Sequence, residues 1–152
     1  MLKGMMGAGV ITLAVILVTG CLHRDVELVY VFPDGFHGVA KIRSNRPTGV
    51  TLAARDEGME RRIITLEFPA SGVLEIKGES PTLDWYSPSA RYAGGKTIPV
   101  AGVDKGVAKD VIALRGMGGV IDDEEWYVVG TFNDLLKANK ERHAYKYPDR
   151  KK

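Results

Sequence analysis

Residues 64–77 read ITLEFPASGVLEIK, and this stretch predicts the fold class more directly than any other. Ile64, Leu66 and Phe68 alternate with polar residues, which is the period-two pattern of a strand with one buried and one solvated face. A proline and a glycine interrupt the alternation at 69–72, after which it resumes. We therefore expect two strands that pair with each other as an antiparallel hairpin.

Similar strand signals recur along the chain between turn-forming residues. The further strands are predicted at residues 27–32, 37–43, 50–54, 97–100, 107–114 and 126–129. A polar loop is expected at 55–60, and an irregular connection packed by aromatic rings at 79–95. Short strands at such spacing are typical of a small antiparallel β-sandwich or a partly open barrel.

One segment near the C-terminus has the pattern of an α-helix. Thr131 and Asp134 form a capping pair at its start. Its apolar stripe, which should lie against the sheet, consists of Phe132, Leu135 and Leu136. The helix is expected to end near residue 142. The predicted domain is therefore mainly β with one C-terminal α-helix, and it spans 27–143.

Composition narrows the possible functions. The chain has 152 residues, of which 26% are charged and 45% hydrophobic, and this fits one globular domain with an N-terminal addition. A formal net charge of +2 argues against a nucleic-acid partner. The single cysteine cannot form an internal disulfide, and with three scattered histidines it cannot supply the usual zinc ligand set. We expect no cofactor.

The N-terminus has the layout of a secretory signal. Residues 1–21 read MLKGMMGAGVITLAVILVTGC, with one positive charge at Lys3, an apolar segment and then small residues. A helix of about eleven apolar residues, rising about 1.5 Å per residue, covers only about half of a roughly 30 Å hydrocarbon core. We therefore expect a signal helix that is removed, rather than a permanent membrane span.

The end of this segment resembles the lipobox of bacterial lipoproteins. Val18, Thr19 and Gly20 supply an aliphatic residue and two small residues directly before Cys21. The resemblance implies recognition of these three residues by a dedicated signal peptidase, cleavage before Cys21, and attachment of lipid, including palmitate-type chains, to that cysteine. The alternatives are an ordinary signal peptide that happens to end at a cysteine and an uncleaved anchor.

The resemblance also implies an organisation and a location. The signal peptide would be 1–20, the lipidated cysteine and its tether 21–26, and a basic tail 144–152 would follow the domain. The domain would be extracytoplasmic and held to the membrane by lipid. Leu22 stands where an aspartate would resemble an inner-membrane retention signal, so the periplasmic face of the outer membrane is favoured in a Gram-negative cell.

The mature part resembles an uncharacterised family of small bacterial proteins, many of them lipoproteins. The stretches that carry this resemblance are 32–39 (FPDGFHGV), 68–74 (FPASGVL) and 126–131 (WYVVGT). That family has no agreed catalytic residues, so the resemblance implies no site. The first stretch is typical of a turn between the first two strands, with proline and glycines where the backbone bends.

The densest acidic cluster consists of Asp122, Asp123, Glu124 and Glu125. Four carboxylates in one loop can bind a hard cation such as calcium through their oxygen atoms. They are consecutive, however, whereas calcium loops place their ligands at alternating positions, and this favours a solvated turn before a buried strand.

A second candidate is aromatic. Trp85, Tyr86 and Tyr92 could form a surface on which a sugar or a peptide stacks, although packing within the fold would explain them without a ligand. No catalytic arrangement of histidine, serine or cysteine is visible, so we do not expect an enzyme. The leading expectation is a structural or protein-interaction role among envelope proteins. The alternatives are a lipoprotein that binds a small ligand or a metal ion and, last, a hydrolytic enzyme.

Overall fold

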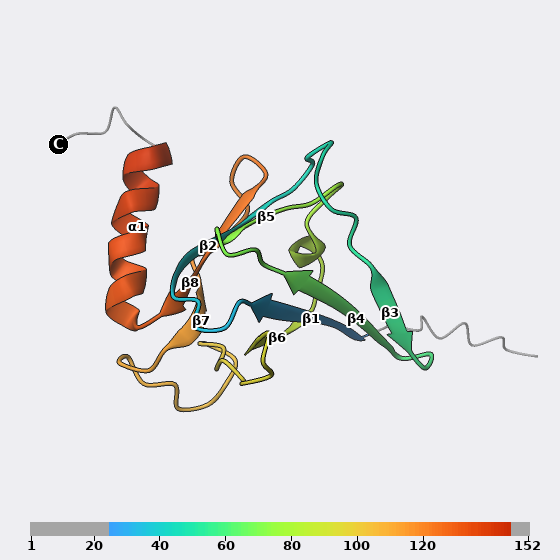
Figure 1. Ribbon diagram of the computed structural model, residues 1–152, viewed down its shortest axis with the longest axis horizontal. Helices are drawn as coiled ribbons and strands as arrows, with labels where there is room; N and C mark the ends of the chain where they lie inside the picture. Colours follow the sequence, from blue (N-terminus) through green and yellow to red (C-terminus); the bar gives the residue numbers. More distant parts are fainter. Residues whose placement is uncertain (1–24, 147–152) are drawn as a thin grey trace, which may run out of the picture.

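Residues 25–146 are described by the structure, which is a computed structural model. The predicted mainly β fold with one C-terminal helix is confirmed, and the strands form two four-stranded sheets rather than a closed barrel (Figure 1). In chain order the elements are β1 (Asp25–Phe32), β2 (Gly38–Arg43), β3 (Ala54–Glu57), β4 (Arg61–Glu67), β5 (Val73–Glu75), a 3-10 helix η1 (Pro81–Leu83), β6 (Ser87–Tyr92), β7 (Ala113–Gly116), β8 (Glu124–Gly130) and α1 (Phe132–Lys146).

The two sheets are mixed rather than antiparallel throughout. The first has the order β3-β4-β1-β6, and β1 runs parallel to both of its neighbours. The second has the order β5-β2-β8-β7, in which β2 and β5 are parallel and the other pairs are antiparallel. The expectation of purely antiparallel sheets is therefore wrong for three of these pairs.

The hairpin predicted within 64–77 is also wrong, because its two strands belong to different sheets. The amide of Phe68 donates to the carbonyl of Val31 in the first sheet, whereas the carbonyl of Gly72 accepts a hydrogen bond from the amide of Lys41 in the second sheet at 2.8 Å. The chain passes from the first sheet to the second at Gly72. A side chain at this position would collide with the ring of Phe36, so glycine is required. The alternation was read correctly, but both strands turn their apolar faces to one core from opposite sides.

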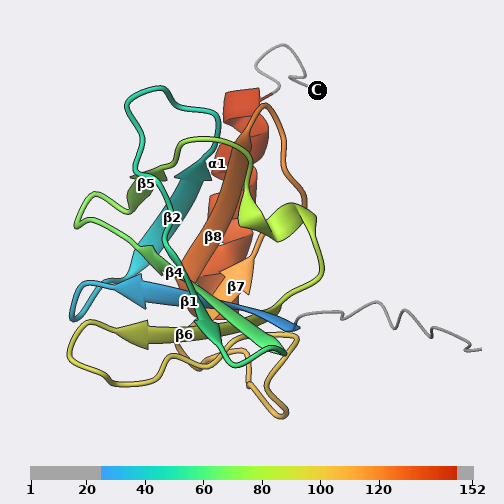
Figure 2. The same ribbon diagram turned by 90° about the vertical axis from the view of Figure 1, so that its right-hand side faces the viewer.

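The core lies between the sheets, whose strands cross at a steep angle (Figure 2). Alternation along the strands that border this space directs every second residue into it. The buried side chains that share the core include Leu28, Tyr30, Phe32, Ala40, Ile42, Leu66, Phe68, Leu74, Ile76, Ala90, Ile98, Leu114, Tyr127 and Val129. Phe32 stacks on both Phe36 and Phe68, with ring centroids 5.2 and 4.6 Å apart, so the predicted turn after β1 closes one end of the core.

Several element boundaries differ from the prediction. The segment expected to be irregular at 79–95 contains β6, which tolerates Pro88 because it is an edge strand. The expected polar loop at 55–60 contains most of β3, which is fully exposed and therefore has no apolar alternation to reveal it. The strand expected at 97–100 makes only isolated bridges, and that expected at 107–114 is replaced by β7.

Helix α1 covers the outer face of the second sheet (Figure 1). The predicted capping pair is confirmed, since the Thr131 amide and hydroxyl donate to Oδ2 of Asp134 at 2.8 and 2.7 Å. Leu136 is 46% exposed, however, and the buried contacts of the helix come from Ala138 and Arg142. The helix also continues past the predicted end to Lys146. Within 25–146 no helix has the length and apolar character that a membrane span requires.

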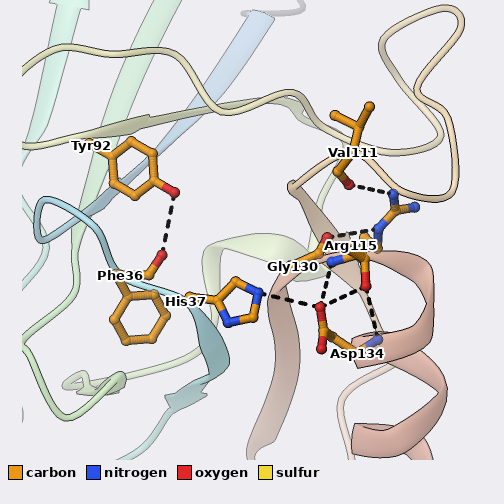
Figure 3. Close-up of polar contacts among 8 residues, drawn as sticks. Phe36, His37, Tyr92, Val111, Arg115, Gly130 and Asp134 are labelled. Carbon is orange, nitrogen blue, oxygen red and sulfur yellow. Dashed lines mark hydrogen bonds and ion pairs between the residues drawn. The ribbon is translucent and has the colours of Figure 1, made fainter.

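Two buried arginines hold loops through main-chain carbonyl groups. Arg115 of β7 donates to the carbonyls of Val111 and Gly130 at 3.0 and 3.1 Å (Figure 3). It also donates to the carbonyl of Ala108 at 3.0 Å. Arg142 of α1 donates in the same way to carbonyls of the β7–β8 loop, at residues 117–119. The loops at both ends of β7 are therefore fixed to the sheet and the helix.

Candidate functional site

The four consecutive acidic residues do not form one site. Asp122 and Asp123 lie in the tight turn before β8 with φ angles of 54° and 60°, a conformation that aspartate tolerates better than most residues. Glu124 and Glu125 follow inside the strand and are 5% and 6% exposed. The expected solvated turn is therefore correct for the first two residues and wrong for the last two, because β8 begins two residues earlier than predicted.

Glu124 faces the outer side of the second sheet. Its Oε1 accepts a hydrogen bond from Nε of Arg43 at 2.9 Å, and its Oε2 accepts one from the Trp126 indole at 3.1 Å. Arg43 pairs with Glu124 across β2 and β8, so the strand register sets the two charges side by side. This carboxylate is buried as one half of an ion pair.

Glu125 faces the inner side and is bound by hydroxyl groups. Ser80 donates to its Oε1, while Thr82 and Tyr127 each donate to its Oε2 at 2.7 Å. The Tyr30 hydroxyl donates in turn to that of Tyr127 at 3.2 Å. Within the described part of the chain, Glu125 has no ion pair with a lysine, arginine or histidine.

Burial and the nearby carboxylate make the two core phenols hard to ionise. Burial raises the pKa of Tyr127 strongly, and the neighbouring Tyr30 and Glu125 raise it further. Burial also raises the pKa of Tyr30, although its hydrogen bond to Tyr127 works in the opposite direction. Both phenols therefore stay protonated and remain donors in the chain that ends at Glu125.

A pocket of about 460 Å³ opens beside this carboxylate. One wall comes from η1 and the segment that follows it, through Thr82, Leu83 and Tyr86. Another comes from the β7–β8 loop at 116–120, whose backbone is held from outside by Arg142. Glu125, Trp126 and Tyr127 of β8 and Ala101 complete the lining. The pocket therefore brings together segments that lie far apart in the sequence.

The three aromatic residues predicted to form a ligand surface do not lie together. Trp85 is 87% exposed, and Tyr86 lines the pocket and packs against the core. Tyr92 lies at the far end of β6, about 20 Å along the strand, where its hydroxyl donates to the carbonyl of Phe36 at 3.4 Å (Figure 3). Only Trp85 and Tyr86 remain as members of one candidate site, and Leu83, which is 60% exposed, joins them.

The residues that hydrogen-bond to Glu125, directly or through Tyr127, were not predicted; they are Ser80, Thr82, Tyr127 and Tyr30. Glu125 and Tyr127 are two apart in a strand and must share a face, so this pair could have been found from the sequence. Ser80 and Thr82 could not, because their contact with Glu125 spans more than forty residues and carries no local signal.

A second polar group surrounds Asp134 at the start of α1. The ring of His37 points at the Asp134 carboxylate, with Nε2 3.3 Å from Oδ2 (Figure 3). The hydrogen bonds of Thr131, with a contribution from His37, lower the pKa of Asp134. Here the carboxylate lies between the hydroxyl and the imidazole, so the imidazole cannot take the hydroxyl proton as it does in a serine-type triad. The arrangement explains a helix cap and does not support the hydrolytic alternative.

A larger groove of about 880 Å³ runs along the outer face of the first sheet beside residues 50–55. Three acidic and three basic side chains line it, so their formal charges cancel. Among them, Arg61 binds Glu27, and Arg55 binds Glu57 at 2.7 Å. The bond from Arg61 holds the pKa of Glu27 below its ordinary value. With its charges already matched, this groove is a weaker candidate than the pocket at Glu125.

The remaining predicted site residues, Val18, Thr19, Gly20 and Cys21, lie outside the described residues. Among residues 25–146, no three histidine, cysteine, aspartate or glutamate side chains gather closely enough to hold a metal ion. No family model, curated protein or solved structure matches this chain.

Proposed function

We propose that the chain is the precursor of a bacterial lipoprotein, whose domain is tethered outside the cytoplasm and binds another envelope protein through the surface of Leu83 and Trp85. The exposed tryptophan on a fixed segment carries the second half of this proposal. The lipobox carries the first half.

The anchor is supported by the sequence around Cys21. An apolar segment of signal-peptide length precedes Val18, Thr19 and Gly20, and the domain begins only a few residues after the cysteine. Two or three acyl chains, at about 0.8 kcal/mol per buried methylene, hold a protein stably on a bilayer, whereas one chain does not. In a Gram-negative cell we place the protein on the periplasmic face of the outer membrane.

The docking surface is supported by exposure and by rigidity. Trp85 and Leu83 are 87% and 60% exposed and lie two residues apart, so one short segment offers a partner two large apolar side chains. The segment that carries them is not loose, because Ser80 and Thr82 bind the buried Glu125 just before it and Tyr86 packs on the core just after it. Tryptophan on a preorganised backbone is the residue type most enriched in binding hot spots.

The anchor is tested by Cys21→Ser. Cells that express either form are labelled with radioactive palmitate and separated into membrane and soluble fractions. We expect label and membrane attachment only in the native protein. Absence of label from the native protein, or equal attachment of the variant, would contradict the anchor.

The docking surface is tested by photo-crosslinking in intact cells. A photoreactive amino acid replaces Asp84, which lies between the two apolar residues, and in a matched control it replaces Met59, an exposed apolar residue at 73% exposure. We expect one reproducible adduct from position 84, at least tenfold weaker when Trp85→Ser is added, and none of that size from position 59. Equal adducts from both positions, or an adduct that ignores Trp85, would refute the surface.

A further inference from the structure

The pocket at Glu125 has a lining that suits a positive charge. Glu125 is its one acidic side chain, and Tyr86 and Tyr127 supply aromatic surface. Within the described residues, no lysine, arginine or histidine lines it. A carboxylate beside aromatic rings, without a basic neighbour in the wall, is the usual composition of a site for an organic cation.

The hydrogen bonds of Glu125 supply no positive charge to its carboxylate and leave one of its acceptor positions unused. An ionised carboxylate accepts at about four positions, and the three hydroxyl donors of Ser80, Thr82 and Tyr127 use three of them. All three donors are neutral, so they satisfy geometry without supplying a counter-charge. The unused position belongs to Oε1, which accepts only from Ser80.

We propose that this pocket binds an ammonium or guanidinium group, with the cation on Glu125 and its alkyl stem along Tyr86. The inference rests on the proposed function, because Leu83 belongs to both the pocket and the docking surface. The cation is then a lysine or arginine side chain of the partner, which enters the pocket while the partner covers Trp85.

A metal ion fits the pocket less well than an organic cation. Calcium takes six to eight oxygen ligands, commonly with several carboxylates, and the pocket offers one. Pocket volume also favours an organic group, since about 460 Å³ is ample for a butyl chain with its charged head. Glu125 therefore acts as one partner of an ion pair that the other protein completes.

The test is a titration of the full chain, labelled with ¹⁵N, in micelles of an uncharged detergent. The probes are n-butylammonium chloride, n-propylguanidinium chloride and, as a neutral match, n-butanol. We expect saturable shifts of the amide signals of Tyr86, Tyr127 and residues 116–120 with both cations and none with butanol. Saturation by butanol with the same affinity, or no saturable shift with either cation, would overturn the proposal.

Two glutamine variants locate the charge. Glu125→Gln keeps the shape and is expected to weaken butylammonium binding at least tenfold. Glu79→Gln removes an exposed charge one residue before Ser80 and is expected to leave the affinity unchanged. Binding that survives Glu125→Gln, or that is lost in Glu79→Gln, would show that general surface charge attracts the cation and would refute the site.

A second variant keeps the proposal testable if Glu125→Gln does not fold. Val120→Lys places a tethered ammonium in the pocket lining and is expected to abolish butylammonium binding by filling the site, whereas Val120→Met is expected to retain it. Undiminished binding in Val120→Lys would contradict the assignment.

Two peptides test whether the cation is a side chain of the partner, and one variant tests the docking surface independently of the pocket. The tripeptide acetyl-Ala-Lys-Ala-amide is expected to bind, and acetyl-Ala-norleucine-Ala-amide is not; failure of the lysine peptide while butylammonium binds would overturn the assignment to a partner side chain. Trp85→Ser is expected to weaken the crosslink in cells at least tenfold but to leave butylammonium binding within twofold. If the crosslinking experiment refutes the docking surface, the titration therefore still tests the cation site.

Discussion

Glu124 and Glu125 are adjacent in the sequence and equally buried, yet their environments have nothing in common. Glu124 points outward to a guanidinium and an indole, and it is neutralised within the domain. Glu125 points inward to three hydroxyl groups and a pocket, and the described domain does not neutralise it. The alternation of one strand thus turns one carboxylate into a structural ion pair and leaves the other facing an opening.

The largest expected effect comes from breaking the ion pair on the outer side. Arg43→Met leaves Glu124 buried without its guanidinium, and we expect the free energy of unfolding to fall by about 3 kcal/mol. Urea denaturation measures this loss. Adding Glu124→Gln should recover at least half of it, because the stranded charge is then gone. A double variant less stable than the single one would show that the pair is not what stabilises this face.

A smaller effect is expected from the inner side. Tyr127→Phe removes one of the three donors to Glu125 and should cost about 1.5 kcal/mol at neutral pH, because a buried acceptor loses a partner. The matched control is Tyr145→Phe at an exposed ring, which should change stability by less than about 0.5 kcal/mol. Equal losses in the two variants would mean that the hydroxyl network contributes nothing measurable.

The same phenols predict how stability depends on alkaline pH. Their pKa values are raised in the folded state, so above about pH 10 the unfolded chain releases protons that the folded chain keeps. The free energy of unfolding should therefore be constant near neutral pH and fall as the pH rises above about 10. Tyr127→Phe should make this fall shallower than in Tyr145→Phe, as measured by urea denaturation at a series of pH values. Parallel curves would contradict the prediction.

The smallest effect is expected in the turn that precedes both glutamates. Asp122 is exposed and has a φ of 54°, a conformation that asparagine adopts as readily as aspartate. Asp122→Asn should therefore change the free energy of unfolding by less than about 0.5 kcal/mol in urea denaturation. A larger loss would mean that the charge of the acidic turn matters to the fold, as it does for Glu124.

Local signals in the sequence were enough to find several of the strands and the start of the helix. The strands that became β1, β2 and β8 were predicted to within a few residues, and the Thr131 and Asp134 cap fixed the start of α1. The strands among these elements are rich in β-branched and aromatic residues, and the helix begins at a defined capping motif. By contrast, β3 has four exposed residues and β6 contains a proline, so neither carries the expected pattern.

Partners across the sheets could not be predicted from such signals. The period of 64–77 shows which residues are buried, but it does not show whether the next strand returns to the same sheet or crosses the core. The candidate site depends on the same kind of long-range pairing, since Ser80 and Thr82 meet Glu125 only after both sheets are assembled. The acidic motif therefore included Glu125, but it gave no sign that this residue is buried and bound by hydroxyl groups.

Arg115 has a consequence for how this protein can diverge. It donates hydrogen bonds to the main-chain carbonyls of Ala108 and Val111 in the loop before β7. Every amino acid has such a carbonyl, so these bonds do not depend on the side chains of the loop. Substitutions in that loop can accumulate without loosening it, provided that the guanidinium stays. Lysine cannot replace it, because Nε and Nη2 of Arg115 bind carbonyls at separate places, whereas all three donors of lysine lie on one nitrogen. Homologous chains should then share an invariant arginine next to a loop of freely changing composition, and the same loop is a sound place to graft an epitope.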